Sequence, residues 1–124
     1  MKLLSGHQEA MPYLIVTNAE NFIDFLKRIF KAQEMVRKLD QKHQVTYAEV
    51  AIGSSTLLIS EASPSYPAQP ISLFVYVPDA DQAYYNALDE GAQPLMSPLE
   101  EDNNARSAGF RDPFGNTWWL STLN

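Results

Sequence analysis

The sequence contains no cysteine. This absence excludes disulfide bonds, cysteine-ligated zinc, iron–sulfur clusters and thiol nucleophiles. Histidine is also scarce, with only His7 and His43 among 124 residues. We expect His7 to lie in a loose N-terminal segment and His43 in a hairpin turn, both exposed to solvent and neither on a cavity face.

Positive charge is limited, with 9 Lys and Arg against 15 Asp and Glu and a formal net charge of −6. Proteins that bind phosphate backbones carry the opposite balance, so nucleic acid is not an expected partner. No apolar run reaches the roughly 18 residues of a membrane-spanning helix, and the N-terminus lacks the apolar stretch of a signal peptide. We therefore expect a cytoplasmic protein that does not bind membranes.

Several catalytic motifs are missing as well. The sequence has no GxSxG nucleophile elbow, no GxGxxG and no P-loop, so serine hydrolase chemistry and dinucleotide or NTP binding have no support. The acidic run Glu100-Glu101-Asp102 precedes an expected strand and is typical of a solvated loop rather than a metal site.

Regular patterns are present along most of the chain. Apolar residues at helical spacing after the capping residue Asn18 predict an amphipathic helix over 19–30. A second helix is predicted from Pro78-Asp79 to Glu90, where Gly91 ends it. Short β-branched and apolar runs predict strands over 11–17, 33–38, 45–52, 56–60, 71–77, 93–96, 106–111 and 117–122.

These elements repeat. Residues 16–19 resemble 77–80, and residues 56–59 resemble 117–120, with the same shift of 61 in both comparisons. Such a shift predicts two copies of one βαβββ unit, which alone could not bury its sheet. We therefore expect one α+β domain over 1–124, with a first module at about 11–62, a linker at about 62–70 and a second module at about 71–124.

Strand alternation predicts an aliphatic face beneath the helices and an aromatic face on the other side of the sheet. The aromatic face supplies the candidate ligand-binding residues Tyr13, Tyr47, Glu49, Phe74, Tyr76, Phe110 and Trp119. A curved sheet with this lining is typical of an amphipathic ligand cavity, while a second core layer or a dimer interface is the alternative.

Glu49 is the one carboxylate of interest on the aromatic face. Burial among aromatic residues would raise its pKa, so that it could serve as a general base or pair with a cationic ligand. The alternative is a rim position in water.

The segment RSAGFRDPFGNTWWLST, residues 106–122, resembles the vicinal-oxygen-chelate superfamily of glyoxalase I, bleomycin-resistance proteins and extradiol dioxygenases. Residues 12–30 and 45–55 resemble the opening of its PhnB-like branch. The resemblance covers the chain after about residue 10. It implies tandem βαβββ modules that form a curved, half-open barrel sheet, in a homodimer with cavities near the subunit interface.

The resemblance also implies where a metal would bind, with one ligand from the first strand of each module and one from a later strand of each. These family positions fall on Met11, Glu49, Ser72 and Trp119. Only Glu49 suits a divalent cation, because a catalytic metal needs about three ligands from His, Asp, Glu or Cys. We therefore expect no metal and no cofactor, which favours a binding protein over an enzyme.

Three functions remain open at this point. The leading hypothesis is a metal-free binding protein, similar to bleomycin-resistance proteins, that holds a hydrophobic or cationic small molecule in the aromatic-lined cavity of a homodimer. The first alternative is a metal-dependent lyase or dioxygenase of the same superfamily. The second is a structural or interaction module that binds no ligand and whose aromatic face is only a dimer interface.

Overall fold

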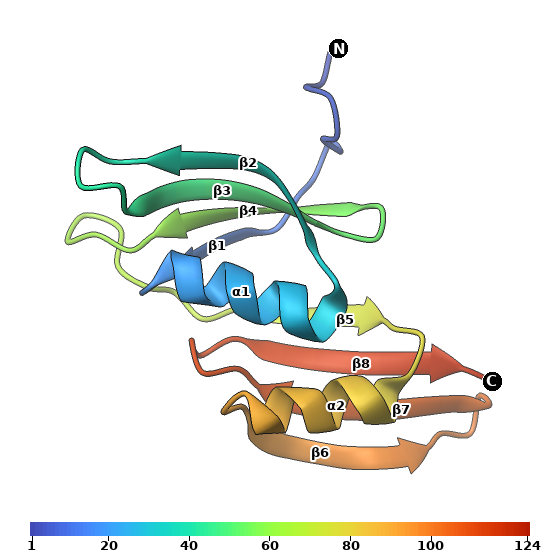
Figure 1. Ribbon diagram of the computed structural model, residues 1–124. Coiled ribbons are helices and arrows are strands. Elements are labelled where there is room, and N and C mark those ends of the chain that lie inside the picture. Colours follow the sequence, from blue (N-terminus) through green and yellow to red (C-terminus); the bar gives the residue numbers. More distant parts are fainter. The chain divides into compact units, whose positions relative to one another are not determined.

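The computed structural model describes residues 1–124, which form two compact units, Met1–Gln69 and Pro70–Asn124. We call them module one and module two. Each contains four strands and one helix in the order βαβββ, so the predicted α+β class with tandem modules is confirmed (Figure 1). Each four-stranded sheet is open rather than closed into a barrel. Neither helix is long and apolar enough to span a bilayer.

Module one pairs its first strand with its last. The sheet order is β1-β4-β3-β2, with β1 parallel to β4 and the other neighbours antiparallel. Its helix lies across one face of the sheet (Figure 1). The elements are β1 (Tyr13–Val16), α1 (Ala19–Phe30), β2 (Gln33–Leu39), β3 (Val45–Ile52) and β4 (Ser55–Glu61).

Module two repeats this topology with the order β5-β8-β7-β6, and β5 is parallel to β8. Its edge strand β6 is longer than the predicted 93–96. Pro94 and Pro98 interrupt the sequence pattern there, but an edge strand tolerates proline because one side of its ladder is unpaired. The elements are β5 (Ser72–Tyr76), α2 (Ala80–Asp89), β6 (Gln93–Glu100), β7 (Ala105–Arg111) and β8 (Thr117–Leu123).

Both helices are fixed at their N-termini by the last strand of their own module. The Glu61 carboxylate at the end of β4 accepts the backbone N–H groups of Asn18 and Ala19, at 2.9 and 2.8 Å. In module two the Thr122 hydroxyl accepts the N–H of Ala80 at 2.8 Å. Each contact satisfies N–H groups that a helix start leaves without an intrahelical partner.

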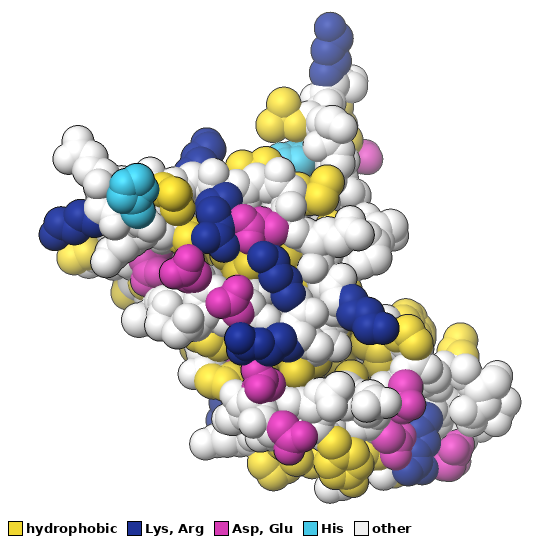
Figure 2. Space-filling view, viewed as in Figure 1, with side chains coloured by type: hydrophobic (Ala, Val, Ile, Leu, Met, Phe, Trp, Pro, Cys, Tyr) yellow, Lys and Arg dark blue, Asp and Glu magenta, His cyan; other side chains and the backbone are white.

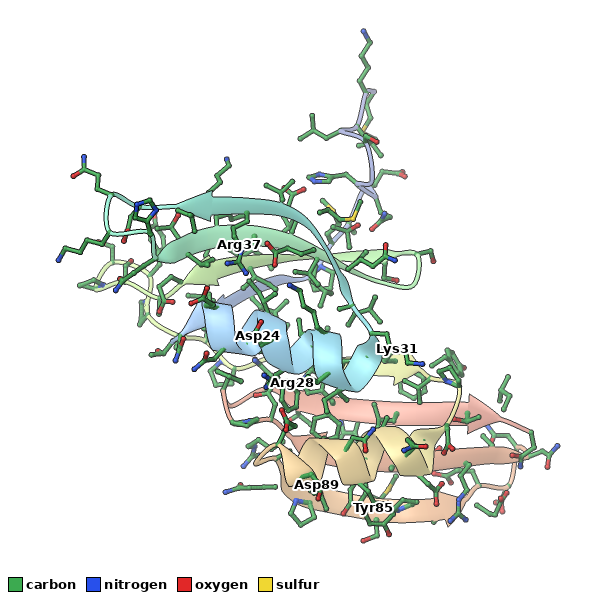
Figure 3. All side chains as sticks on the ribbon, in the orientation of Figure 1. Asp24, Arg28, Lys31, Arg37, Tyr85 and Asp89 are labelled. Carbon is green, nitrogen blue, oxygen red and sulfur yellow. The ribbon has the colours of Figure 1, made fainter.

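The outer surface of α1 and β2 carries interleaved acidic and basic side chains (Figure 2). Arg37 on β2 contacts Glu34 at 2.6 Å and Glu20 at 3.1 Å, while Lys27 contacts Glu34 at 2.9 Å. The hydrogen bond from Arg37 lowers the pKa of Glu34. Arg37 is labelled in Figure 3. These ion pairs lie on a surface in contact with solvent, where such pairs contribute little to stability.

The turn between β7 and β8 is organised by the buried side chain of Asp112. One carboxylate oxygen accepts the backbone N–H groups of Phe114 and Asn116 at 2.8 and 3.0 Å, and the other accepts the indole N–H of Trp118 at 2.7 Å. Burial raises the pKa of Asp112. Gly115 has φ of 94°, the backbone geometry in which glycine is preferred.

Strand register shows where the repeat is regular and where it slips. Tyr13 pairs with Leu58, and Phe74 pairs with Trp119, so the first and last strands keep the shift of 61. The third strands do not keep it, because Leu58 faces Glu49 whereas Trp119 faces Gly109. The shift between β3 and β7 is therefore 60, and a slip of one residue exchanges the two faces of a strand.

Candidate functional site

Each module has one sheet face turned away from its helix, which we call the open face. In module one, the helix-side residues Leu14, Ala48 and Val50 are fully buried. The open face carries Tyr13 and Ile15 from β1, Tyr47 and Glu49 from β3, and Leu58 and Ser60 from β4. Of the predicted site residues, the structure therefore brings Tyr13, Tyr47 and Glu49 together.

Glu49 is held by two donors on this face. His7 Nε2 lies 2.8 Å from Oε1, and the Tyr47 hydroxyl donates to Oε2 at 2.7 Å. The side chains of His7 and Glu49 are only 14% and 13% exposed. The prediction that His7 is a loose, exposed residue away from the cavity face is therefore wrong, because the segment before β1 folds back against the sheet.

The two hydrogen bonds also correct the expected electrostatics of Glu49. The hydrogen bond with His7, followed by that from Tyr47, lowers the pKa of the carboxyl below its ordinary value of 4.5. Burial among aromatic residues alone, one of the two environments that the sequence left open for Glu49, would have raised this pKa. Glu49 is thus an ionised, hydrogen-bonded acceptor at neutral pH, and its lowered pKa makes the carboxylate less basic, not more basic, than an ordinary one.

The phenols extend this polar cluster across the sheet. The Tyr13 hydroxyl lies 2.6 Å from Ser60 Oγ, and the ammonium of Lys38 on β2 lies 5.3 Å from the centre of the Tyr47 ring. Desolvation, together with the hydrogen bond to Glu49, raises the pKa of Tyr47 to about 12. Tyr47 therefore acts as a hydrogen-bond donor at neutral pH.

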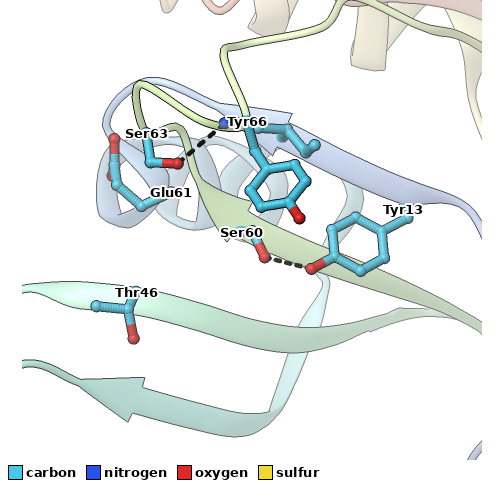
Figure 4. Close-up of a pocket in the computed structure, with 7 residues that line it drawn as sticks. Tyr13, Thr46, Ser60, Glu61, Ser63 and Tyr66 are labelled. Carbon is cyan, nitrogen blue, oxygen red and sulfur yellow. Dashed lines mark hydrogen bonds between the residues drawn. The ribbon is translucent and has the colours of Figure 1, made fainter.

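A cavity of about 480 Å³ opens next to Tyr13. Its volume falls within the range of small-molecule sites, roughly 300–1,000 Å³. The hydroxyl groups of Tyr13 and Tyr66 point toward the same region near Ser60 (Figure 4). The lining residues are Tyr13, Ile15, Thr46, Ser60, Glu61, Ser63 and Tyr66.

The wall that carries Tyr66 comes from the segment expected to be only a linker. Ser63 and Tyr66 form a turn, with the Tyr66 N–H donating to Ser63 Oγ at 3.1 Å. Further along, the Gln69 N–H donates to the Ile15 carbonyl at 3.0 Å and extends the edge of β1. Proline and serine content correctly indicated irregular backbone here but carried no signal for cavity formation.

The open face of module two is more aromatic. Phe74 and Tyr76 on β5 form an edge-to-face pair with ring centres 5.1 Å apart, and they are 59% and 66% exposed. Trp119 on β8 lies beside Phe74 in the parallel ladder and is 37% exposed. Its indole lies over Gly109, where an added Cβ would overlap Cζ3 and Cε3 of the ring.

Phe110 does not belong to this face. It pairs across the ladder with Trp118, and both side chains are fully buried in the core. Strand alternation had placed Phe110 on the aromatic face with Trp119, but in the observed register Gly109 is the residue opposite Trp119 and Phe110 lies opposite Trp118. Of the residues predicted for a site in module two, the open face therefore carries Phe74, Tyr76 and Trp119.

The donor set of the implied metal site does not fit a divalent cation. Strand register also shows that Glu49 and Trp119 are not equivalent, since the residue of module one that matches Trp119 is Leu58. The corresponding positions then offer the thioether of Met11, the apolar side chain of Leu58, the indole of Trp119 and the hydroxyl of Ser72. Both carboxylate oxygens of Glu49 already accept hydrogen bonds, and no three His, Asp or Glu side chains cluster in the structure.

The chain belongs to the Glyoxalase/Bleomycin resistance protein/Dioxygenase superfamily, whose model matches residues 7–120. A relative in Mycobacterium tuberculosis, the uncharacterized protein Rv0887c, is 26% identical over 120 residues, which cover 88% of this chain and 71% of that protein.

Three solved structures illustrate the shared fold. TioX from Micromonospora sp. ML1 is 17% identical and has a TM-score of 0.77, covering 95% of this chain and all of that one. The PhnB protein from Bacillus cereus is 15% identical with a TM-score of 0.76, covering 94% and 100% of the two chains. The fosfomycin resistance protein FosX from Mesorhizobium loti is 18% identical with a TM-score of 0.67, covering 95% and 93%. At these identities the likeness concerns the fold.

Proposed function

We propose that the protein is a metal-free binding protein that holds a hydrophobic or cationic small molecule on the open faces of its sheets, as a homodimer in the cytoplasm. The observation that carries the proposal is the cavity of about 480 Å³ beside Tyr13, on the same face as the ionised Glu49. Exposed phenol and indole rings supply stacking and cation–π surface, each worth about 0.5–2 kcal/mol.

Three further features support this assignment. The net charge of −6 and the lowered pKa of Glu49 favour a positively charged ligand. The donor set at the family's metal positions is unsuitable for a Lewis-acid mechanism. FosX, which is a fosfomycin resistance protein, has the same fold, and this likeness supports a role in binding a drug-like molecule.

The proposal is tested by isothermal titration calorimetry with a planar cation, 2-naphthylmethylammonium, and its neutral counterpart 2-naphthylmethanol. Tyr13→Ala is expected to weaken binding of both probes to the open face of module one, and Trp119→Ala to weaken their binding to the open face of module two, each about tenfold or more, the scale for loss of an aromatic anchor. Tyr85→Ala is the matched control for Tyr13, because Tyr85 points outward from α2 (Figure 3) and the two side chains are 54% and 51% exposed.

Each outcome is informative. If the Tyr13, Trp119 and Tyr85 variants bind the probes with equal affinity, the open faces do not form the binding site. Light scattering measured in parallel gives the oligomeric state, and a monomer that binds the probes would contradict only the homodimer. Loss of dimerisation in Trp119→Ala without any probe binding by the parent protein would instead favour an interaction module.

A further inference from the structure

The segment before β1 is fastened to module one at a small number of points. The Thr56 hydroxyl donates to the Gly6 carbonyl at 2.5 Å, and the Thr56 N–H donates to Gln8 Oε1 at 3.1 Å. The third contact joins His7 to Glu49. We call residues Gly6–Gln8 the N-terminal strap.

Most of the N-terminal segment around the strap is exposed. His7 and Gln8 are half-buried, whereas residues 1–6, 9 and 10 are exposed. A segment with so little buried apolar surface belongs to the low-stability end of a protein and can detach without unfolding the sheet. Its release costs about three hydrogen bonds, each of modest net value in water.

His7 provides an N–H donor to the carboxylate at the centre of the open face. The groups that face Glu49 are His7 from the strap, Tyr47 on the same strand, Lys38 on β2 and the apolar Leu58 on β4, while Tyr13 on β1 lies near Tyr47. Tyr47 and Leu58 belong to the sheet and remain in place when the strap leaves. Release of His7 therefore exposes a carboxylate oxygen beside a phenol that still binds the other oxygen.

We propose that His7 is an internal occupant of a cation site formed by Glu49 and Tyr47, and that a ligand with a protonated amine binds module one by displacing His7 and releasing the strap. This inference rests on the function proposed above and names the chemical group that the open face recognises. An alkylammonium offers three N–H donors and a full positive charge, whereas the imidazole offers Glu49 a single N–H. The exchange leaves no buried carboxylate without a partner.

The strap then sets the apparent affinity. If the open site is populated only in a fraction of molecules, the observed affinity is the intrinsic affinity reduced by that fraction. Weakening the strap should therefore strengthen binding of an amine. The same change should have little effect on a neutral probe, which has no reason to contact Glu49.

The experiment measures the affinity of the full chain for 2-naphthylmethylammonium and 2-naphthylmethanol by calorimetry. His7→Ala is expected to bind the ammonium about tenfold more tightly than the parent protein, because the site is no longer occupied. Thr56→Val removes the hydroxyl contact to Gly6 but keeps the N–H contact to Gln8, so it weakens the strap and is expected to act in the same direction with a smaller effect. His43→Ala is the matched control, since His43 lies in the exposed β2–β3 turn.

A second variant identifies the acceptor. In the His7→Ala background, Glu49→Gln is expected to abolish the preference for ammonium over alcohol while retaining binding of the alcohol. Melting curves establish that each variant is folded.

The results separate this inference from the proposed function. If the parent protein binds both probes and neither His7→Ala nor Thr56→Val binds the ammonium more tightly, the strap is not a competitor and the inference is overturned while the binding function stands. If neither the parent nor the released variants bind either probe, the binding function itself is overturned.

Discussion

The two modules share a backbone plan but differ at the centre of their open faces. In module one, Leu58 on β4 lies between Tyr13 and Glu49. In module two, Trp119 on β8 occupies the matching position, between Phe74 and Gly109. One sheet therefore presents a hydrogen-bonded carboxylate beside a small aliphatic side chain, and the other presents a flat indole over bare backbone.

This difference shows how one βαβββ unit can support two kinds of surface. Glycine at position 109 removes the side chain that would obstruct the indole, so the ring can lie close to β7. Glu49 in module one instead projects from its strand and recruits donors from Tyr47 and His7. The polar surface suits a charged group, and the aromatic surface suits a planar apolar one.

The largest expected effect comes from filling the space beneath the indole. Gly109→Ala would place a Cβ in the volume of Trp119, so the ring must move, and overpacking of this kind costs about 1–3 kcal/mol. Urea denaturation of Gly109→Ala measures the loss in unfolding free energy. The loss should shrink in a Trp119→Ala background, and an equal loss in both backgrounds would mean that the two residues are not coupled.

The β3–β4 and β7–β8 turns provide a second comparison. Gly115 has φ of 94°, farther from the left-handed minimum than Gly53 at 57°. Gly115→Ala is expected to destabilise the protein by about 1–2 kcal/mol and Gly53→Ala by about 1 kcal/mol or less. Chemical denaturation of both variants measures which substitution lowers the free energy of unfolding more. A larger decrease for Gly53→Ala than for Gly115→Ala would contradict the prediction.

Glu49 should make the stability of the folded protein depend on pH in the acid range. Because its pKa is lowered on folding, its contribution to stability is present above the unfolded value of about 4.5 and is lost as the pH falls through the lower folded value. Melting curves between pH 3 and 7 should show that acid lowers the free energy of unfolding by about 1 kcal/mol less in Glu49→Gln than in the parent protein. Glu9→Gln is the control, because it removes the same charge from an exposed position. If the stability of the two variants depends on pH in the same way, the hydrogen bonds of Glu49 are not the cause of the acid dependence.

The smallest expected effect is that of added metal. With Leu58 and Trp119 at matching positions, neither module offers a ligand set, so Ni, Zn, Mn and Fe(II) should leave the melting temperature unchanged. Elemental analysis of the untagged protein purified without chelator is expected to find no stoichiometric metal. A metal-specific rise in melting temperature would instead point to a metal-dependent enzyme.

Local pattern was sufficient to predict much of the fold. The helix over 19–30 was located to the residue because five apolar side chains follow one helical face after Asn18. The strands of module one were located within a residue or two at most ends, since β-branched runs and tight turns bound them. The strand β6 extends beyond the predicted 93–96 because its pairing with β7 continues past Pro98, and the sequence pattern of β6 alone does not reveal that pairing.

The residues of the candidate site were harder to predict from the sequence than the fold was. Phe110 was misplaced because a register slip of one residue in β7 leaves no mark in composition. His7 was missed because a short segment without periodicity gives no sign of the strand on which it will fold. Its partner Glu49 was recognisable as unusual, yet only the tertiary contacts show which donors satisfy it.

The parallel pairing of the first and last strands also constrains how each module is made on the ribosome. Tyr13 cannot meet Leu58, and Glu61 cannot reach the start of α1, until the entire intervening chain has left the exit tunnel. Such distant pairing slows folding, because a long loop must close before the contacts form. Until then β1 lacks its neighbour and α1 lacks the carboxylate that caps it, so the incomplete first module leaves an apolar strand unpaired.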